Sequence, residues 1–232
     1  FEFNPDQAPG YGTAQSWLST NSGEQWTGQG NARISAVNTL VEDTFTDVNG
    51  TLLANHTPDV GGPWVQLASS AVTLEINGNQ LTPTAKESIG EYVIDAGAGD
   101  CEASCTTIVS GVDPTNRTLT RLRVRVSAPS ALDGYMCQIV SSENPFMQLI
   151  EEGGAGLVRS AFVISEVENR FTLSASGSVV TASFGPESVS YNLATVTANT
   201  YCGVGLRTQG SPATESYAED FKVTSITDAP LP

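Results

Sequence analysis

Short runs of alternating hydrophobic and polar residues follow one another along most of the chain. In FTLSASG (residues 171–177) and TLTRLRVRV (residues 118–126), every second side chain is apolar or small. Turn-forming segments such as VNGT, INGN and ALDG separate these runs, and no segment shows the period of an amphipathic helix. About a dozen short strands at this spacing predict an all-β sandwich or barrel.

Residues 1–39 follow a different pattern. They are rich in Gly, Gln, Ser, Asn and Thr and show no sustained period. They nevertheless carry five large aromatic residues, namely Phe1, Phe3, Tyr11, Trp17 and Trp26. Because aromatic side chains bury a large area in contacts, we interpret this segment as an extended arm that docks on a partner or on its own domain. The alternative is a disordered leader. The predicted organisation is an arm at 1–39, a sandwich at 40–228 and a tail at 229–232.

Composition limits the function. The length of 232 residues suits one large all-β domain with an arm. The formal charge of −15 argues against binding to nucleic acid or to an anionic membrane surface. It fits a protein displayed outside a cell or on a particle, where like charges prevent association. No apolar run approaches the ~20 residues needed to span a bilayer. The sequence begins at Phe1 without a signal peptide, so we expect a processed chain or a fragment.

The four cysteines, Cys101, Cys105, Cys137 and Cys202, allow two disulfides. Cys101 and Cys105 lie in GAGDCEASCTT, a stretch of small residues that we interpret as a loop closed by a Cys101–Cys105 bridge. Cys137 and Cys202 lie in apolar runs, where they form a second disulfide or remain buried thiols. A zinc site is disfavoured because Cys137 and Cys202 are not a close pair. A disulfide would indicate an oxidising compartment.

The single histidine, His56, lies in the segment EDTFTDVNGTLLANHTPDVGGPW, residues 42–64. Its acidic neighbours suggest a catalytic or metal-binding loop at first sight. The density of turn formers favours a corner between strands, with Asn49-Gly50 as a turn of positive φ. We therefore predict that His56 is a hydrogen-bonding corner residue and that the corner delivers Trp64 towards the core.

Four motifs occur in a characteristic order: Gly134-Tyr135, the hairpin from Phe171 to Val180, the strand Gly203 to Arg207, and the closing strand Asp220 to Val223. This order resembles the concanavalin A-like lectin/glucanase family, and in particular its laminin-G-like members in tailed-phage and bacterial surface proteins. The resemblance implies a two-sheet antiparallel jelly-roll β-sandwich. The stretch that contains Cys101 and Cys105 is interpreted as an insertion relative to the order of motifs in that family.

The resemblance also implies that the first and last strands lie side by side. VEDTF and AEDFKV would then bring together Glu42, Asp43, Glu219 and Asp220. Relatives often bind calcium on the sandwich, and oxygen ligands suit that ion, so this acidic cluster is a candidate calcium site. The alternative is that these acids are solvated on the surface.

A row of arginines is the candidate ligand groove. Arg121, Arg123 and Arg125 alternate with apolar residues and are expected on one strand face. Since one sheet of such sandwiches often holds the ligand, this row could bind acidic sugars or a partner's carboxylates through bidentate contacts. The alternative is cross-strand pairing with Glu or Asp.

The sequence disfavours an enzyme. Glucanases on this fold carry two glutamates with an aspartate between them, and the nearest pattern here, Glu166 and Glu168, lacks that aspartate. A serine hydrolase would need His56 with a G-x-S-x-G turn, which is missing. Metal catalysis normally needs more than one His or a set of cysteines.

Two functions remain. The first is a non-enzymatic structural module on a virion or particle surface, such as a phage head decoration or tail component, docked through its arm and oligomeric with other capsid or tail subunits. The alternative is a lectin-like adhesion module that binds glycans. Its sugar-stacking candidates are Trp64, Tyr92, Tyr135, Tyr191, Tyr201 and Tyr217. In both cases we expect a virion or extracellular location and no cofactor beyond a structural calcium ion.

Overall fold

The computed structural model describes residues 17–18, 25–27, 33–35, 38–109, 117–141, 145–152, 156–161, 167–193, 196–210, 215–226 and 228–230. The chain divides into two compact units, one formed by Phe1–Asn38 with Ser225–Pro232 and the other by Thr39–Thr224. The described residues form strands and turns, with a short 3₁₀ helix, η2, at Leu53–Asn55. Within these residues, none of the helices has the length and hydrophobicity to cross a membrane. The all-β prediction is confirmed.

The smaller unit contains a four-stranded sheet in the order β1-β2-β3-β20. Its strands are β1 (Trp17–Leu18), β2 (Gln25–Thr27), β3 (Arg33–Ser35) and β20 (Asp228–Pro230). Trp17 pairs with Trp26, and residues 228–230 pair with residues 33–35. The segment expected as an extended arm thus contains strands, which at two or three residues are too short to show a period in sequence. Phe1, Phe3 and Tyr11 lie outside the described residues.

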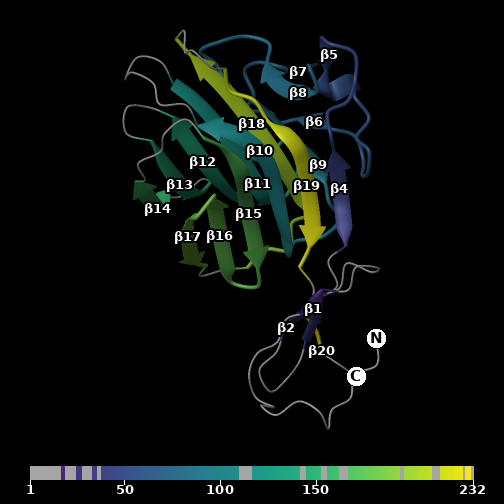
Figure 1. Ribbon diagram of the computed structural model, residues 1–232, viewed down its shortest axis with the longest axis vertical. Coiled ribbons are helices and arrows are strands. Elements are labelled where there is room, and N and C mark those ends of the chain that lie inside the picture. The colour runs from purple at the N-terminus through teal and green to yellow at the C-terminus, as the bar shows by residue number, and fades with distance from the viewer. Residues whose placement is uncertain are drawn as a thin grey trace. The chain divides into compact units, whose positions relative to one another are not determined.

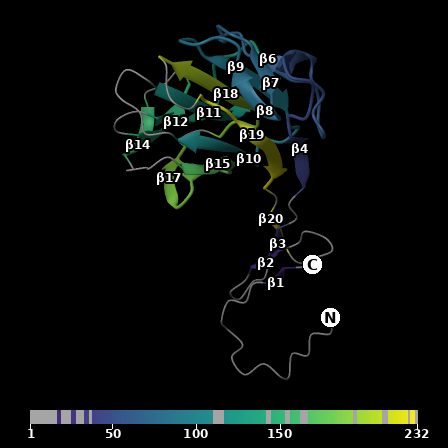
Figure 2. The same cartoon turned by 45° about the horizontal axis from the view of Figure 1, so that its top comes forward.

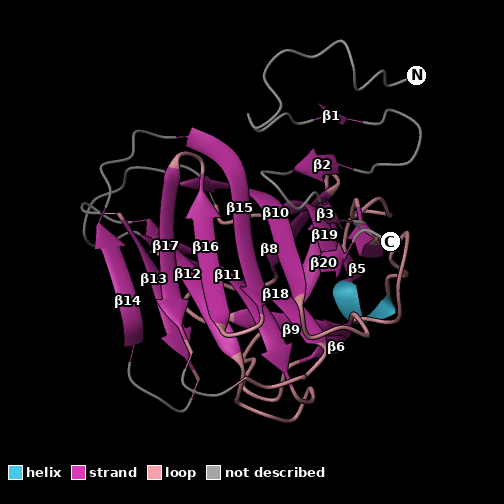
Figure 3. Ribbon diagram, turned by 90° about the horizontal axis from the view of Figure 1, so that it is seen from below, coloured by secondary structure: helices cyan, strands magenta, loops and turns pink. Residues whose placement is uncertain are grey.

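The larger unit contains a six-stranded and a seven-stranded antiparallel sheet (Figure 1). The six-stranded sheet consists, in spatial order, of β17 (Glu187–Asn192), β16 (Val179–Phe184), β15 (Val167–Ser176), β10 (Cys101–Val109), β19 (Glu219–Ser225) and β4 (Thr39–Asp43). Figure 3 shows β17, β16, β15 and β10 side by side. The first and last strands of this unit, β4 and β19, pair directly, with Asp43 opposite Phe221 and Glu42 opposite Lys222. This confirms the neighbourhood predicted for VEDTF and AEDFKV.

The seven-stranded sheet consists, in spatial order, of β14 (Gly156–Ala161), β13 (Phe146–Glu151), β12 (Tyr135–Ser141), β11 (Arg117–Val126), β18 (Tyr201–Gln209), β9 (Gly90–Asp95) and β6 (Val65–Gln66). A small third sheet is formed by β5 (Thr51–Leu52), β7 (Leu74–Asn77) and β8 (Gln80–Pro83). Gly78 and Asn79, both with positive φ, connect β7 to β8 in a two-residue hairpin turn, as the INGN motif predicts.

The core of the larger unit lies between its two main sheets, which Figure 2 shows from another side. Period-two alternation places one side of each strand in this core. The six-stranded sheet contributes Phe171, Leu173, Ala175, Val180 and Phe221, and the seven-stranded sheet contributes Tyr92, Ile94, Leu122, Val124, Val204 and Leu206, all fully buried. This arrangement is the predicted jelly-roll β-sandwich.

The structure contradicts the two predicted disulfides, and it agrees with the alternative that Cys137 and Cys202 are buried thiols. Cys101 and Cys105 are on one extended strand, β10, four residues apart, and therefore about 13 Å apart at 3.3 Å per residue. A disulfide needs Cα atoms within about 7 Å, so these two cannot bridge. Cys137 on β12 and Cys202 on β18 are separated by the intervening strand β11 and cannot bridge either. All four cysteines are free and buried in the structure.

Candidate functional site

A row of polar side chains crosses the outer face of the seven-stranded sheet, the face turned away from the core. Strand register aligns Gln148, Gln138, Arg121, Gly205 and Glu91 on five successive strands, from β13 to β9. Because alternation along each strand puts all these positions on the outer side, the row is continuous. We call these five residues the Arg121 row.

Hydrogen bonds connect the Arg121 row from end to end. Gln138 donates through Nε2 to Gln148 Oε1 at 3.0 Å, and Arg121 Nε donates to Gln138 Oε1 at 3.2 Å. Arg121 also donates through a terminal nitrogen to Glu91 Oε1 at 3.2 Å. The Arg121 guanidinium therefore has a fixed orientation, since Gln138 on one side and Glu91 on the other accept hydrogen bonds from it.

Glycine at position 205 makes this connection feasible. Glu91 and Arg121 are on strands two spacings apart, roughly 9–10 Å, with β18 between them. A Cβ atom on Gly205 would lie 2.7 Å from Glu91 Cγ and 3.1 Å from Glu91 Oε1. The Glu91 side chain thus passes over β18 through the space that a larger residue would fill.

The Arg121 row has a buried neighbour in Arg123. Its Nε and one terminal nitrogen donate to Glu91 Oε1 at 3.1 and 3.0 Å, and the same terminal nitrogen donates to Glu152 at 2.8 Å. The side chains of Arg123 and Glu91 are each 2% exposed, whereas that of Arg121 is 21% exposed. The part of the Arg121 row that is accessible to solvent therefore consists of Arg121, Gln138 and Gln148.

The row is only partly the arginine row expected from sequence. Arg121 and Arg123 point outward as predicted, and both form the cross-strand ion pairs that the alternative interpretation described. Arg125 does not belong to the row, because the register between β11 and β18 shifts between Arg123 and Val126. This bulge gives Arg125 a φ of 56° and turns it off the outer face. Its fully buried guanidinium donates instead to the carbonyls of Gly99 at 3.0 Å and Gly177 at 2.8 Å and pairs with Asp100.

Basic residues concentrate on this outer face. Of the ten Lys and Arg residues in the chain, those whose described side chains occupy outer-face positions of the seven-stranded sheet are Arg117, Arg121, Arg123 and Arg207. Arg207 has a buried Nε without a hydrogen-bond partner among the described residues. In a protein with a net charge of −15, several arginines thus share one sheet face, where Arg121 and Arg123 are paired with Glu91 and Glu152.

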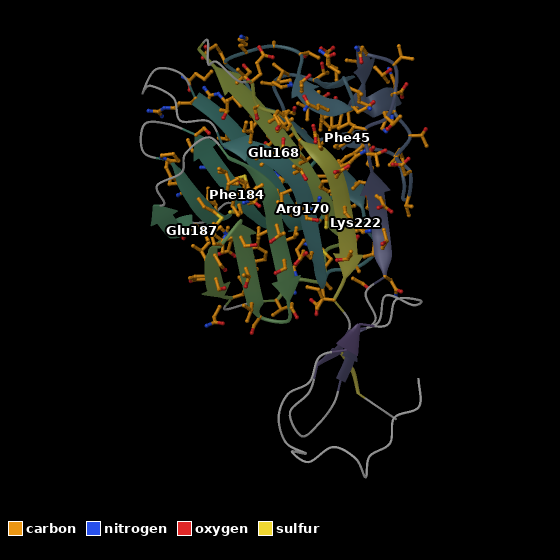
Figure 4. All side chains as sticks on the ribbon, viewed as in Figure 1. Phe45, Glu168, Arg170, Phe184, Glu187 and Lys222 are labelled. Carbon is orange, nitrogen blue, oxygen red and sulfur yellow. The ribbon has the colours of Figure 1, made fainter. Side chains whose placement is uncertain are left out.

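The four acidic residues predicted to cluster between β4 and β19 do not share one site, because each of them has its own hydrogen-bonding environment. Glu42 accepts from Lys222 Nζ at 3.3 Å, and Glu219 accepts from Gln80. The Asp220 side chain is exposed, and its backbone carbonyl accepts from Arg170 at 2.9 Å. Figure 4 shows Arg170 on β15 and Lys222 on β19.

These carboxylates do not fit the predicted calcium site. Glu42 and Asp43 are adjacent on β4 and point to opposite faces, so they cannot both face one ion. Two cations, Arg170 and Lys222, line the depression of about 160 Å³ at this place and supply the compensating charge. In the part of the chain that the structure describes, no group of three or more His, Cys, Asp or Glu residues could hold a metal ion.

The fourth member of that cluster, Asp43, organises the corner around His56. Its carboxylate is fully buried and accepts from His56 Nε2 at 3.0 Å, from the Phe45 amide at 2.8 Å and from Trp64 Nε1 at 2.7 Å. Trp64 packs edge-on against Phe221, with ring centroids 5.0 Å apart. The predictions that His56 is a hydrogen-bonding corner residue and that the corner delivers Trp64 to the core are confirmed.

Both ring nitrogens of His56 face carboxylates, because Nδ1 lies 2.9 Å from Asp47 Oδ2. Burial lowers the pKa of His56, but the hydrogen bonds that the ring makes to the Asp47 and Asp43 carboxylates outweigh this effect, so the pKa is raised above 6.5. Both ring nitrogens are thus engaged by carboxylates of the corner, which fits the hydrogen-bonding role of His56.

The remaining candidate residues are the aromatic residues proposed to stack on sugars and the glutamates considered for glycoside hydrolysis. Among the aromatic residues proposed to stack on sugars, Trp64, Tyr92, Tyr135 and Tyr217 are buried, and Tyr191 is 37% exposed. Glu168 accepts a hydrogen bond from the Tyr217 hydroxyl. Glu166 lies outside the described residues. Sequence reasoning missed Glu91, Gln138 and Gln148, although the outward polar residue in YMCQIVS was a signal for Gln138.

No family model matches this chain, and no curated protein sequence matches it either. Solved structures do resemble it. The CBM2 module of a Lactobacillus casei BL23 phage J-1 evolved Dit protein aligns with a TM-score of 0.53 at 8% identity, over 83% of this chain and 97% of that module. The Ca²⁺- and mannose-bound exoplasmic/lumenal domain of VIP36 aligns with a TM-score of 0.51 at 12% identity, over 84% of this chain and 99% of that domain.

A third similar structure comes from work on human gut bacteria that express endo-acting O-glycanases to initiate mucin breakdown. It aligns with a TM-score of 0.53 at 10% identity, over 82% of this chain and 100% of that chain. At these identities the likeness shows the fold. The chain therefore has the jelly-roll β-sandwich of carbohydrate-binding modules and lectins.

Proposed function

We propose that this chain is a non-catalytic, lectin-like module that binds an anionic glycan on the outer face of its seven-stranded sheet. The observation that carries the proposal is the concentration of arginine on this face of a protein whose net charge is −15. Clusters of one charge sign raise the local concentration of ligands of the opposite sign. A glycan with carboxylate or sulfate groups is the sugar class that such a surface attracts.

The chemistry of the Arg121 row suits such a ligand. Guanidinium and amide groups present planar sets of donors that match carboxylates and vicinal hydroxyls. The row is fixed by internal hydrogen bonds, so its groups lose little conformational freedom when a ligand binds. The buried state of most aromatic residues argues against a surface that relies on stacking.

The similar structures support carbohydrate binding, because they include a mannose-bound domain and a module of a phage Dit protein. They support a structural role on a particle to about the same degree. The two roles are compatible, and the Arg121 row favours glycan binding as the function of the sandwich. We place the module on an extracellular or virion surface, where glycans are accessible.

Isothermal titration of the full chain with polygalacturonate, heparin and neutral mannan tests the proposal. We expect binding to at least one anionic glycan, weaker binding to mannan, and a loss of affinity as salt is raised. Arg207→Ala should weaken binding about tenfold or more, corresponding to ~1.4 kcal/mol, because it removes a positive charge from an outer-face position of β18.

Arg170→Ala is the matched control, since it removes one arginine from the other sheet. It should change affinity less than twofold. Equal binding of neutral and anionic glycans, no binding at all, or an equal effect of the two variants would each contradict the proposal.

A second function is favoured by the separate unit of residues 1–38 and 225–232. A unit with its own small sheet, in which Trp17 pairs with Trp26, is suited to attachment to another subunit. We propose that it anchors the module in an assembly.

A further inference from the structure

Two buried thiols face each other across the sandwich. Cys101 begins β10 of the six-stranded sheet, and Cys202 is the second residue of β18 of the seven-stranded sheet. Their Sγ atoms are 3.3 Å apart, and both residues are fully buried. The contact joins positions that are far apart in sequence and belong to opposite sheets.

We propose that Cys101 and Cys202 form a disulfide that ties the two sheets together when the protein folds in an oxidising compartment. An S–S bond is about 2.05 Å long, so the sulfur atoms need to approach by about 1.3 Å. Small side-chain rotations at two facing positions can supply such a movement. This pairing is a different connectivity from the one that sequence spacing suggested.

The surrounding backbone holds the two cysteines in place. Gly99 and Asp100, which immediately precede Cys101, are bound by the buried guanidinium of Arg125. The strand β11 that carries Arg125 pairs with β18 next to Cys202, through Val126 and Tyr201. The starts of β10 and β18 are thus fixed to the same segment of β11, which keeps the two thiols opposite each other.

The other two cysteines have no such partner. Cys105 is paired in the backbone ladder with Phe171, and Cys137 with Leu122 and Leu149. Both are fully buried, and the structure shows no sulfur–sulfur contact for these two described residues. Burial raises the pKa of the Cys105 thiol to about 12 and also raises that of Cys137, so both are poor nucleophiles. They act as small apolar core residues.

The oxidation requires a disulfide oxidant, for which oxidised glutathione serves. The thiolate of one cysteine attacks the glutathione disulfide, forming a mixed disulfide and releasing one reduced glutathione. The thiolate of the second cysteine then attacks the protein sulfur of that mixed disulfide, which forms the Cys101–Cys202 bond and releases the second reduced glutathione. In the folded state the neighbouring Cys101 thiol and burial raise the pKa of Cys202. The exchange is therefore expected before the sheets close.

The test is to refold the reduced full chain with a mixture of reduced and oxidised glutathione, quench free thiols with iodoacetamide, and map the peptides by mass spectrometry. Trypsin alone leaves Cys101 and Cys105 in one peptide, but cleavage after Glu102 separates them. We expect a peptide that contains Cys101 linked to one that contains Cys202, together with alkylated Cys105 and Cys137. The intact chain should lose the mass of two hydrogen atoms, and its thermal midpoint should rise by several degrees, reversibly on reduction.

A double variant, Cys105→Ala with Cys137→Ala, should form the same bridge, whereas Cys202→Ala should leave Cys101 alkylated. Four alkylated cysteines in the unaltered chain, or a bridge between any other pair, would overturn the proposal. The peptide map of the unaltered chain decides the question even where a variant does not fold. It is also independent of glycan binding, so the two proposals fail separately.

Discussion

At the scale of single residues, the corner around His56 depends on one proton. The folded-state pKa of His56 is raised above 6.5 by Asp47 and Asp43, against the effect of burial. The folded protein therefore binds this proton more tightly than the unfolded chain does. Its contribution to stability is fully present below pH 6.5 and is lost as the pH rises through the folded-state pKa.

We predict that the free energy of unfolding decreases as the pH is raised above 6.5, and that His56→Gln removes most of this decrease. Urea denaturation at a series of pH values measures it. Asp47 and Asp59 contribute on the acid side: a hydrogen bond with His56 lowers the pKa of Asp47, and one from the Thr44 amide lowers that of Asp59. Their contributions are present above pH 3.8 and are lost as the pH falls through the lowered values. An unchanged pH profile in His56→Gln would show that other groups are responsible.

At the scale of secondary-structure elements, β18 shows how a glycine in a central strand positions a site on its neighbours. Gly205 leaves the space through which Glu91 reaches Arg121 and Arg123. We predict that Gly205→Ala destabilises the protein by about 2–4 kcal/mol, because displacing Glu91 leaves Arg123 buried without its main partner.

Gly62→Ala is the matched control for this prediction. Its added Cβ meets no atom within 4 Å, and its φ is not positive, so we expect an effect within about 0.5 kcal/mol. Urea denaturation of both variants gives the comparison. Equal stability of Gly205→Ala and the unaltered chain would mean that Glu91 adopts another route to the two arginines.

The same elements show what the sequence can and cannot predict. Alternation correctly places Arg121 and Arg123 on the outer face of β11, since that pattern is local. It fails at Arg125, because a bulge against β18 shifts the register and only the paired strand reveals it. The acid that joins the two arginines, Glu91, comes from a strand that chain order does not make a neighbour.

The stretch GAGDCEASCTT, which the sequence predicts as a loop, contains most of β10 for a related reason. Cys101, Ala103 and Cys105 are too small to produce a strong strand signal, yet all three are fully buried in the core. Small residues suit a position where large side chains such as Phe171 already fill the space between the sheets. The cross-sheet thiol contact follows from this packing and has no counterpart in sequence spacing.

At the scale of the whole molecule, the order of motifs resembles a known family and so predicts a jelly-roll sandwich. That topology places the first and last strands of the sandwich side by side, as β4 and β19 are. The division into units is less visible in sequence. Residues 225–232 belong with residues 1–38, since β20 pairs with β3. The two main sheets of the larger unit lie within residues 39–225, and its hydrophobic core lies between Val41 and Val223.

This division leads to a prediction about assembly. We expect a fragment of residues 39–226 to unfold cooperatively, with a thermal midpoint within a few degrees of the full chain, because it keeps both main sheets and the core that they enclose. We also expect it to keep its affinity for an anionic glycan, since the Arg121 row belongs to the larger unit.

The full chain should form oligomers in sedimentation velocity experiments, and the fragment should be a monomer, because the aromatic residues of the smaller unit are the proposed attachment point. Removing residues 1–38 while glycan binding persists would separate attachment from recognition. A fragment that still oligomerises would place the attachment surface on the sandwich, and one that folds but no longer binds would place the glycan site outside it.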